Sequence, residues 1–194
     1  AEHGLTIVER PFSNFLPLPD GRYFKLGGTL SATRIEAAKF SRRDAERLPA
    51  YFSAVDRIAD VLRDQVLRIP PNVAAGTLGG LDNLTRSLRF GKILRSLDAA
   101  GRADLLDLFT KSAGELLDHW FEGDALKAAL GFDSVVGNFV SPYSPGCAYG
   151  LLHHGLGEVN GQRGRWGHAI GGMGAITTAM AKEAAARGVK IDVE

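Results

Sequence analysis

The stretch SRRDAERLPAYFSAVDRIADVLRDQVLRIP, residues 41–70, indicates that helices dominate this chain. Ser41, followed three residues later by Asp44, is typical of a capping box at the start of a helix. Pro49 predicts either the first residue of a second helix or a kink, and Pro70-Pro71 ends the pattern. The apolar residues recur at steps of three and four, which places them on one side of an amphipathic helix: Phe52, Val55, Ala59, Leu62, Val66 and Ile69.

Further helices are expected on the C-terminal side of this stretch. The apolar pattern predicts them over residues 81–97 and 102–121, and a run of small residues predicts another over 175–186. Gly188 suits the C-terminal cap of the last helix, because glycine adopts the left-handed backbone that such a cap requires.

Short strands are expected near both ends of the chain. Residues 5–8 and 23–26 predict two strands around a proline-rich loop or wide hairpin, and residues 189–193 alternate as a strand does. A strand at a chain end needs a neighbour, so we expect the native polypeptide to continue. The expected fold class is α+β and predominantly helical, with short strands that belong to a larger α/β domain.

Composition limits the function classes. A chain of 194 residues, with 45% hydrophobic and 23% charged residues, can bury the core of one domain, or of one domain plus a piece of another. Its formal net charge of +1 argues against a dedicated nucleic-acid binder. Cys147 is the single cysteine, which excludes an internal disulfide framework and a cysteine zinc cluster, and favours a reducing, cytoplasmic location. The segment Ala1 to Gly4 shows no secretory signal.

Residues 134–157 contain no Asp, Glu, Lys or Arg, which indicates a stretch shielded from water or facing an apolar ligand. Pro142, Pro145 and five glycines disfavour a membrane-spanning helix. The alternatives are a buried core turn with a helix, or a wall that lines a ligand site. If it is a wall, the side chains expected nearest the ligand are Phe139, Tyr143, Tyr149 and His153.

The pair His153-His154 is not expected to bind a metal. Adjacent residues of a helix point about 100° apart, and no acidic residue stands at a zinc-ligand spacing from them. No metal site is therefore predicted. A role for either histidine in proton transfer or in a hydrogen bond to substrate stays open.

Gly171-Gly172-Met173-Gly174-Ala175 precedes the small-residue helix. Such a turn indicates either close packing of helix on sheet or close approach of a flat or anionic ligand. It lacks the Gly-x-Gly-x-x-Gly spacing of a dinucleotide site. Glu9, at the end of an expected strand, is interpreted as a strand-end carboxylate and not as a ribose ligand.

The predicted helix over 81–97 carries a basic face opposite Leu84, Leu88 and Leu94. A basic amphipathic helix is either a solvated surface or a contact with an anionic membrane. The basic residues are Arg86, Arg89, Lys92 and Arg95.

Several motifs in one order give the chain a resemblance to a known family, the phytoene desaturase-like FAD-dependent oxidoreductases. They are residues 116–122 (LLDHWFE), 141–146 (SPYSPG), 151–154 (LLHH), Trp166-Gly167, 171–175 (GGMGA) and, more weakly, 40–45 (FSRRDA). Together these motifs span most of the chain.

The resemblance implies a two-domain enzyme in which residues 1–170 form the helical substrate-binding domain. Residues 171–194 would be an incomplete return element of the FAD-binding domain. The chain alone is not expected to hold FAD tightly, because the family's dinucleotide fingerprint lies outside it. The reaction implied is hydride removal from an apolar or amine-bearing substrate to the flavin.

The resemblance also implies site residues. Gly171, Gly172, Met173 and Gly174 would lie beside the flavin. No catalytic base is assigned, and His153 is the one candidate. Substrate contacts would come from Phe139, Tyr143, Tyr149, His153 and Trp166. The alternative function is a non-catalytic module for homo-oligomerisation or for docking to a membrane or partner through the basic helix.

Overall fold

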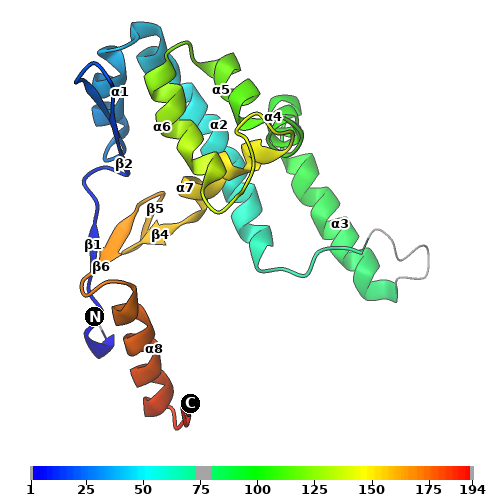
Figure 1. Ribbon diagram of the computed structural model, residues 1–194. Coiled ribbons are helices and arrows are strands. Elements are labelled where there is room, and N and C mark those ends of the chain that lie inside the picture. The colour runs from blue at the N-terminus through cyan, green and yellow to red at the C-terminus, as the bar shows by residue number, and fades with distance from the viewer. Residues whose placement is uncertain (1, 73–79, 193–194) are drawn as a thin grey trace.

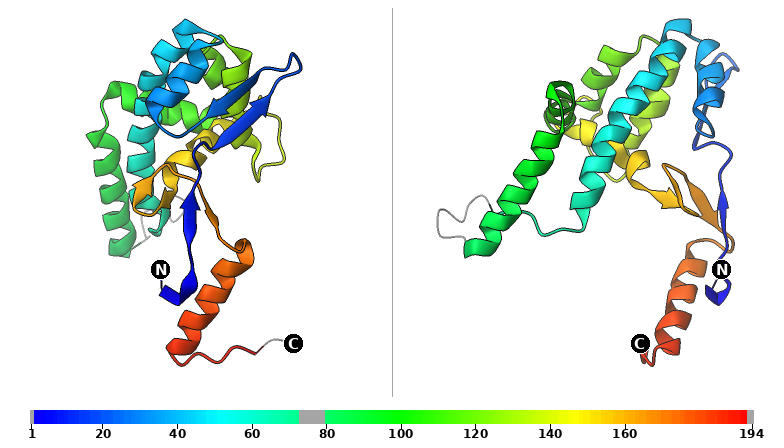
Figure 2. Two further views of the ribbon diagram at one scale, coloured as in Figure 1. Left: turned by 90° about the vertical axis from the view of Figure 1, so that its left-hand side faces the viewer. Right: turned by 180° about the vertical axis from the view of Figure 1, so that it is seen from behind.

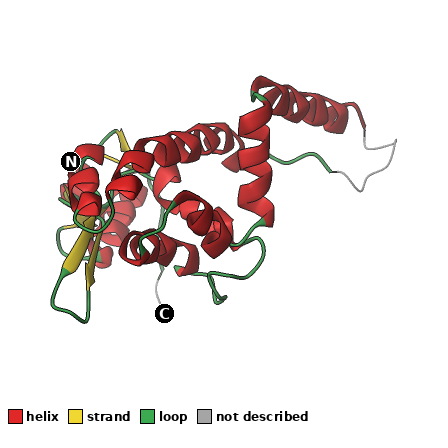
Figure 3. Cartoon of the chain, turned by 90° about the horizontal axis from the view of Figure 1, so that it is seen from above, coloured by secondary structure: helices red, strands yellow, loops and turns green. Residues whose placement is uncertain are grey.

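The computed structural model describes residues 2–72 and 80–192, apart from the side chains of Glu2, Asp64, His153 and His154. Helices form most of this part of the chain, which confirms a predominantly helical architecture with a few short strands (Figures 1 and 3). The α-helices are α1 Leu30–Ala38, α2 Arg42–Val66, α3 Gly80–Ser96, α4 Ala99–Thr110, α5 Ala113–Trp120, α6 Asp124–Val135, α7 His153–Leu156 and α8 Met173–Ala186. Two 3-10 helices are η1 Glu2–Gly4 and η3 Cys147–Leu152.

The strands pair as separate two-stranded ladders, all antiparallel. They are β1 Ile7–Glu9, β2 Asn14–Pro17, β3 Tyr23–Leu26, β4 Glu158–Val159, β5 Gln162–Arg163 and β6 Gly167–Ala169. In the β2–β3 hairpin Phe15 lies opposite Lys25, and in the β1–β6 ladder Val8 lies opposite His168. Strands are thus present near both expected places, as β1 and β3, but the alternative of a wide hairpin between them is wrong, because each pairs with another strand.

Helix α2 starts at the predicted cap, runs through Pro49 and ends at Val66, before the expected end at Pro70. Ser41 caps it, with the Ser41 Oγ accepting the Asp44 N–H at 3.1 Å. Pro49 lies inside the helix and does not start a second one. A proline leaves the carbonyl four residues earlier without its helical donor. That carbonyl, on Ala45, accepts a hydrogen bond from the Arg34 side chain of α1 at 3.1 Å, which compensates for the loss.

The expected helix over 102–121 is two helices, α4 and α5. The first ends at Thr110 with Lys111 as its C-cap. Ser112 caps the second, since its Oγ accepts the Glu115 N–H and its own N–H donates to Glu115 Oε2. This capping box makes a break at Ser112 more favourable than a continuous helix. The predicted helices over 81–97 and 175–186 are confirmed as α3 and α8, and Gly188 has the expected positive φ of 83°.

Two other expectations are not met. Residues 189–192 are not in a strand, and they join none of the described strand ladders. The basic residues of α3 do not form a face opposite Leu84 and Leu88, because at 3.6 residues per turn Lys92 and Arg95 fall on the same stripe as these leucines. None of the described helices has the length and apolarity needed to cross a membrane.

The core lies where α2 packs against α1, α5, α6 and η3. Its largest side chains with less than 2% exposure are Phe24, Leu48, Ile58, Leu126 and Leu152. Figure 2 shows this helical body together with two extensions: α3 stands away on one side, and the β1–β6 ladder leads down to α8 on the other. The body positions the candidate site described below.

Replacing Gly150 with alanine is expected to lower the free energy of unfolding by about 2 kcal/mol. A Cβ at Gly150 would lie 2.6 Å from Ser134 Cα and 3.0 Å from Ser134 O, so backbone of η3 and α6 would have to separate. Urea unfolding followed by circular dichroism measures the change. Gly91→Ala is the matched control, because a Cβ there meets no atom within 4 Å. Equal urea midpoints for Gly150→Ala and Gly91→Ala would contradict the close contact between Gly150 and Ser134.

Candidate functional site

A pocket of about 480 Å³ opens between the β2–β3 hairpin, α1, α2, α6, α7 and residues 163–165. This volume lies within the range of pockets that hold small organic ligands. Most of its wall is apolar, and these side chains come from distant parts of the sequence: Leu26, Leu30, Phe52, Val55, Leu130 and Leu151. Tyr51, Thr33 and Asp133 are the buried polar side chains of the wall.

Tyr51 and Asp133 lie close enough to influence each other. Burial raises the pKa of Tyr51, and the nearby charge of Asp133 adds to this shift. Burial also raises the pKa of Asp133 to about 7, against a hydrogen bond from Asn14 that lowers it. The Asp133 carboxyl group is therefore partly protonated near neutral pH and can donate a hydrogen bond into the pocket.

The Tyr51 ring is held in place by other aromatic rings. Its edge-to-face neighbours are Phe52, Trp120 and Phe121, with ring centroids 5.4, 5.7 and 5.1 Å away. Trp120 and Phe121 belong to the LLDHWFE motif at the end of α5. That motif therefore contributes to the pocket indirectly, because its aromatic rings fix the Tyr51 side chain of the pocket wall.

Glycines 27 and 28 form the rim of the pocket before α1. Both have positive φ, 107° and 75°. A Cβ at Gly27 would lie 2.5 Å from Ser13 N, and one at Gly28 would lie 2.7 Å from Pro11 O, so both positions need glycine. The Thr33 hydroxyl donates to Gly27 O at 3.2 Å and fixes this turn to α1.

Arginines supply the cationic part of the rim. Arg165 donates to Gly28 O, which ties the segment before β6 to the glycine rim. Arg163 forms an ion pair with Asp60 of α2 at 3.2 Å, and Asp60 also pairs with Arg63. Arg63 donates to Gly155 O, so this network joins α2, α7 and β5 around the pocket.

The arrangement suits a ligand with a large apolar part and a polar group. The wall offers dispersion contacts and a desolvated acid, and the rim offers two guanidinium groups. No group of three His, Cys, Asp or Glu side chains among the described residues could hold a metal ion. The site can thus bind and position a substrate, and its own groups can supply hydrogen bonds and proton exchange.

Three of the aromatic residues predicted to contact substrate lie outside this pocket. Phe139 is fully exposed. Tyr143 borders a second hollow of about 430 Å³ beside Gly114 and Phe132, and its hydroxyl lies 3.5 Å from Asp118. Tyr149 stacks on Phe109, with ring centroids 5.4 Å apart. Their contact with a ligand stays a prediction, and the described structure does not bring them together.

The other two lie along the chain next to pocket residues. The backbone of His153 starts α7 between Leu151 and Gly155, which both line the pocket, but its side chain lies outside the described part of the structure. Trp166 follows Arg165 of the rim, and the Arg10 guanidinium lies 5.7 Å from the centre of its ring.

The predicted cofactor residues lie in the turn after β6, at Gly171 and Gly172, and at the start of α8, at Met173 and Gly174. Gly171 and Gly172 have φ values of 88° and 77°. A Cβ at Gly172 or Gly174 would meet no described atom within 4 Å, and Met173 is exposed. Close packing of helix on sheet is therefore not the reason for these glycines within the described residues.

Sequence reasoning missed the residues that build the pocket. One signal was available: Asp133 is the last charged residue before the charge-free stretch 134–157. Gly27-Gly28 directly before Thr29, a good helix N-cap, was another. Neither signal identifies Tyr51 or Arg165, because their roles depend on contacts between distant segments.

Comparisons with known proteins find relatives along the whole chain. The chain is 34% identical over 206 aligned positions to "Pyridine nucleotide-disulfide oxidoreductase domain-containing protein 2" of Rattus norvegicus. Its identity to the Mus musculus protein of the same name is also 34%. The match covers all of this chain but 35% of each relative, so the chain spans about a third of their length. No family model and no solved structure matches.

Proposed function

We propose that this chain forms the substrate-binding part of a phytoene desaturase-like FAD-dependent oxidoreductase. The observation that carries the proposal is the pocket of about 480 Å³, with its mostly apolar wall and buried carboxyl group. The homology to two proteins named as oxidoreductase domain proteins supports the class of activity. Because the chain corresponds to about a third of those proteins, the activity belongs to the complete polypeptide.

The pocket's task in this proposal is to exclude water and to hold the reacting bond of an apolar or amine-bearing substrate. FAD, when bound, supplies the redox chemistry by accepting hydride from the substrate. Asp133 donates a hydrogen bond to a polar atom of the substrate, as its pKa of about 7 allows. Leu26, Val55 and Leu130 surround the apolar part.

The glycine turn is the part of the chain that fits a flavin. With no side chain at Gly171, Gly172 or Gly174, a flat ring can approach the backbone closely. Gly171 stands six positions after Arg165 of the pocket rim, so the two lie at most about 22 Å apart. We assign the turn to the flavin-facing side, with the rest of the polypeptide holding the cofactor.

Closing the mouth of the pocket tests this proposal. In the full-length protein, Leu30→Trp is expected to slow flavin reduction by substrate at least about tenfold, because the indole fills the space that the substrate needs. The measurement is anaerobic reduction of the bound flavin, followed by absorbance, with a panel of apolar and amine substrates. Leu106→Trp is the matched control, because the Leu106 side chain of α4 is exposed and lies outside the pocket.

Both variants are expected to keep the flavin content of the unmodified protein. Equal reduction rates for Leu30→Trp, Leu106→Trp and the unmodified protein would show that substrate does not use this pocket. A protein that takes up no flavin at all would refute the oxidoreductase proposal as a whole.

A further inference from the structure

Helix α3 leaves three of its leucines exposed. None of its residues is buried, and Leu81, Leu84 and Leu88 are 79%, 54% and 65% exposed. Figures 1 and 2 show the helix standing away from the helical body, to which its last residues connect through α4. A helix of this length is marginal in water without packing on one face, which points to a surface that covers α3.

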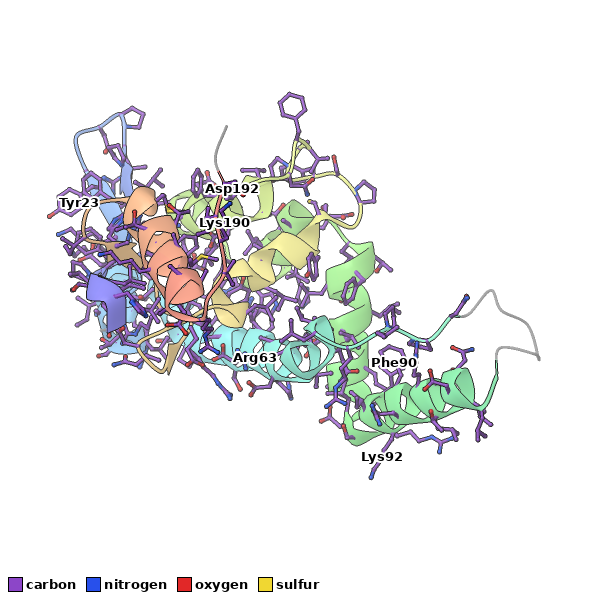
Figure 4. The ribbon with its side chains drawn as sticks, turned by 90° about the horizontal axis from the view of Figure 1, so that it is seen from below. Tyr23, Arg63, Phe90, Lys92, Lys190 and Asp192 are labelled. Atoms are coloured by element: carbon purple, nitrogen blue, oxygen red, sulfur yellow. The ribbon has the colours of Figure 1, made fainter. Side chains whose placement is uncertain are left out.

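The exposed leucines continue into basic residues on the same stripe. At 3.6 residues per turn, Leu81, Leu84 and Leu88 follow one another along the helix, and Lys92 and Arg95 extend the line. Figure 4 shows Lys92 extending outward from the helix, whereas Phe90 points toward the segment that follows α2. The outward stripe is therefore apolar at its start and cationic at its end.

The start of α3 is fixed against the segment that follows α2. The Asn72 N–H donates to Asn83 Oδ1 at 2.7 Å, and Asn83 Nδ2 donates back to Asn72 O at 3.1 Å. Leu67 and Ile69, just before this contact, are 96% and 69% exposed. Among the described residues, exposed apolar side chains therefore occur both after α2, at Leu67 and Ile69, and on α3.

The charged residues of α3 are mostly cations. Its residues carry four cations and one anion, a net charge of +3, and the rest of the chain therefore sums to −2 within the total of +1. The one anion, Asp82, is paired with Arg86. Within the described residues, Arg89, Lys92 and Arg95 have no ion-pair partner of their own.

From these observations we infer that the outward face of α3, with Leu81, Leu84, Leu88, Lys92 and Arg95, docks on an anionic lipid membrane. The leucines enter the boundary of the acyl chains, and the longer basic side chains reach the lipid phosphates. The helix lies in the interface and does not cross the bilayer, because no described helix could span it.

The basic end of the stripe decides between a bilayer and a protein surface. Burying the stripe in a protein interior would remove water from Lys92 and Arg95 without a described acid to pair with them, which is costly. At an anionic bilayer the same side chains stay solvated and gain attraction to phosphate.

The test is co-sedimentation of the full-length protein with vesicles. We expect binding to vesicles of phosphatidylcholine mixed with phosphatidylglycerol, and little binding to phosphatidylcholine alone. Lys92→Glu with Arg95→Glu should lower partitioning to the mixed vesicles by at least about tenfold. Arg42→Glu with Lys182→Glu is the charge-matched control on exposed parts of α2 and α8, and should bind nearly as the unmodified protein does.

A second variant reports insertion without depending on charge. The fluorescence of Leu88→Trp should shift to shorter wavelength with the mixed vesicles and be quenched by brominated acyl chains. Absence of binding to the mixed vesicles would overturn the inference. So would an equal loss of vesicle partitioning in the Lys92→Glu/Arg95→Glu variant and in the Arg42→Glu/Lys182→Glu control. Leu88→Trp fluorescence that does not change with the mixed vesicles would overturn it as well. It is also overturned if Leu84→Ser dissociates an oligomer in size-exclusion chromatography while vesicle binding stays absent.

Discussion

Replacing Asp44 with alanine is expected to lower the free energy of unfolding by about 3 kcal/mol. The Asp44 side chain is 1% exposed, and its two carboxylate oxygens accept the N–H groups of Glu122 at 3.0 Å and Gly123 at 2.8 Å. These donors belong to the two residues just before α6, so Asp44 of α2 anchors the turn into a helix that begins 80 residues further along the chain. Alanine leaves both N–H groups without their acceptor.

Urea unfolding of the Asp44→Ala variant measures this loss, and two other variants separate its causes. Asp44→Asn keeps one acceptor oxygen and should lose less. Glu122→Ala removes an exposed group that contacts Ser41 and Arg43 at the same junction, and should have a much smaller effect. An Asp44→Ala variant that unfolds at the same urea concentration as Glu122→Ala would contradict this anchoring role.

The second large effect concerns pH and Asp133. Burial raises the pKa of Asp133 from its ordinary value of 3.8 to about 7 in the folded chain. Between these values the unfolded chain has lost the proton that the folded chain keeps, so this group makes the fold less stable as pH rises from about 4 to about 7. At about 1.4 kcal/mol per pH unit, the loss over this window is of the order of 4 kcal/mol.

The comparison that isolates Asp133 is with Asp133→Asn, measured by urea unfolding at a series of pH values. Other carboxyl groups act in the opposite direction, since hydrogen bonds lower the pKa values of Glu115 and Glu122. The difference between the two proteins removes their contribution. We expect the asparagine variant to gain stability relative to the unmodified protein as pH rises through this window. A difference that does not change with pH would show that Asp133 is not held protonated.

The sequence predicted best what short segments decide by themselves. Ser41 caps α2 and Gly188 follows α8 because a helix end depends on the few residues around it. The hydrogen bond from Arg34 that replaces the one lost at Pro49 could not be predicted, because the donor to the Ala45 carbonyl comes from another helix. The same holds for Asp44, whose spacing from Ser41 suggests a local capping box although its carboxylate serves α6.

The candidate site was harder to predict than the helices. The pocket joins segments from Ser13 to Arg165, and no periodicity relates such distant residues. The charge-free stretch indicated apolar surroundings correctly at Leu151 and Leu152, which are buried, but not at Phe139, which is exposed. Absence of charge therefore did not distinguish core from surface in this stretch. The places of Phe139, Tyr143 and Tyr149 beside a ligand, and of the glycine turn beside a flavin, stay predictions.

The most direct test of the proposed oxidoreductase is the absorption spectrum of the purified full-length protein. The account predicts the two visible bands of an oxidised flavin, bleached under anaerobic conditions by an apolar or amine substrate. It also predicts that Leu30→Trp keeps the bands but slows the bleaching. A full-length protein that is colourless and remains so after incubation with FAD would contradict it.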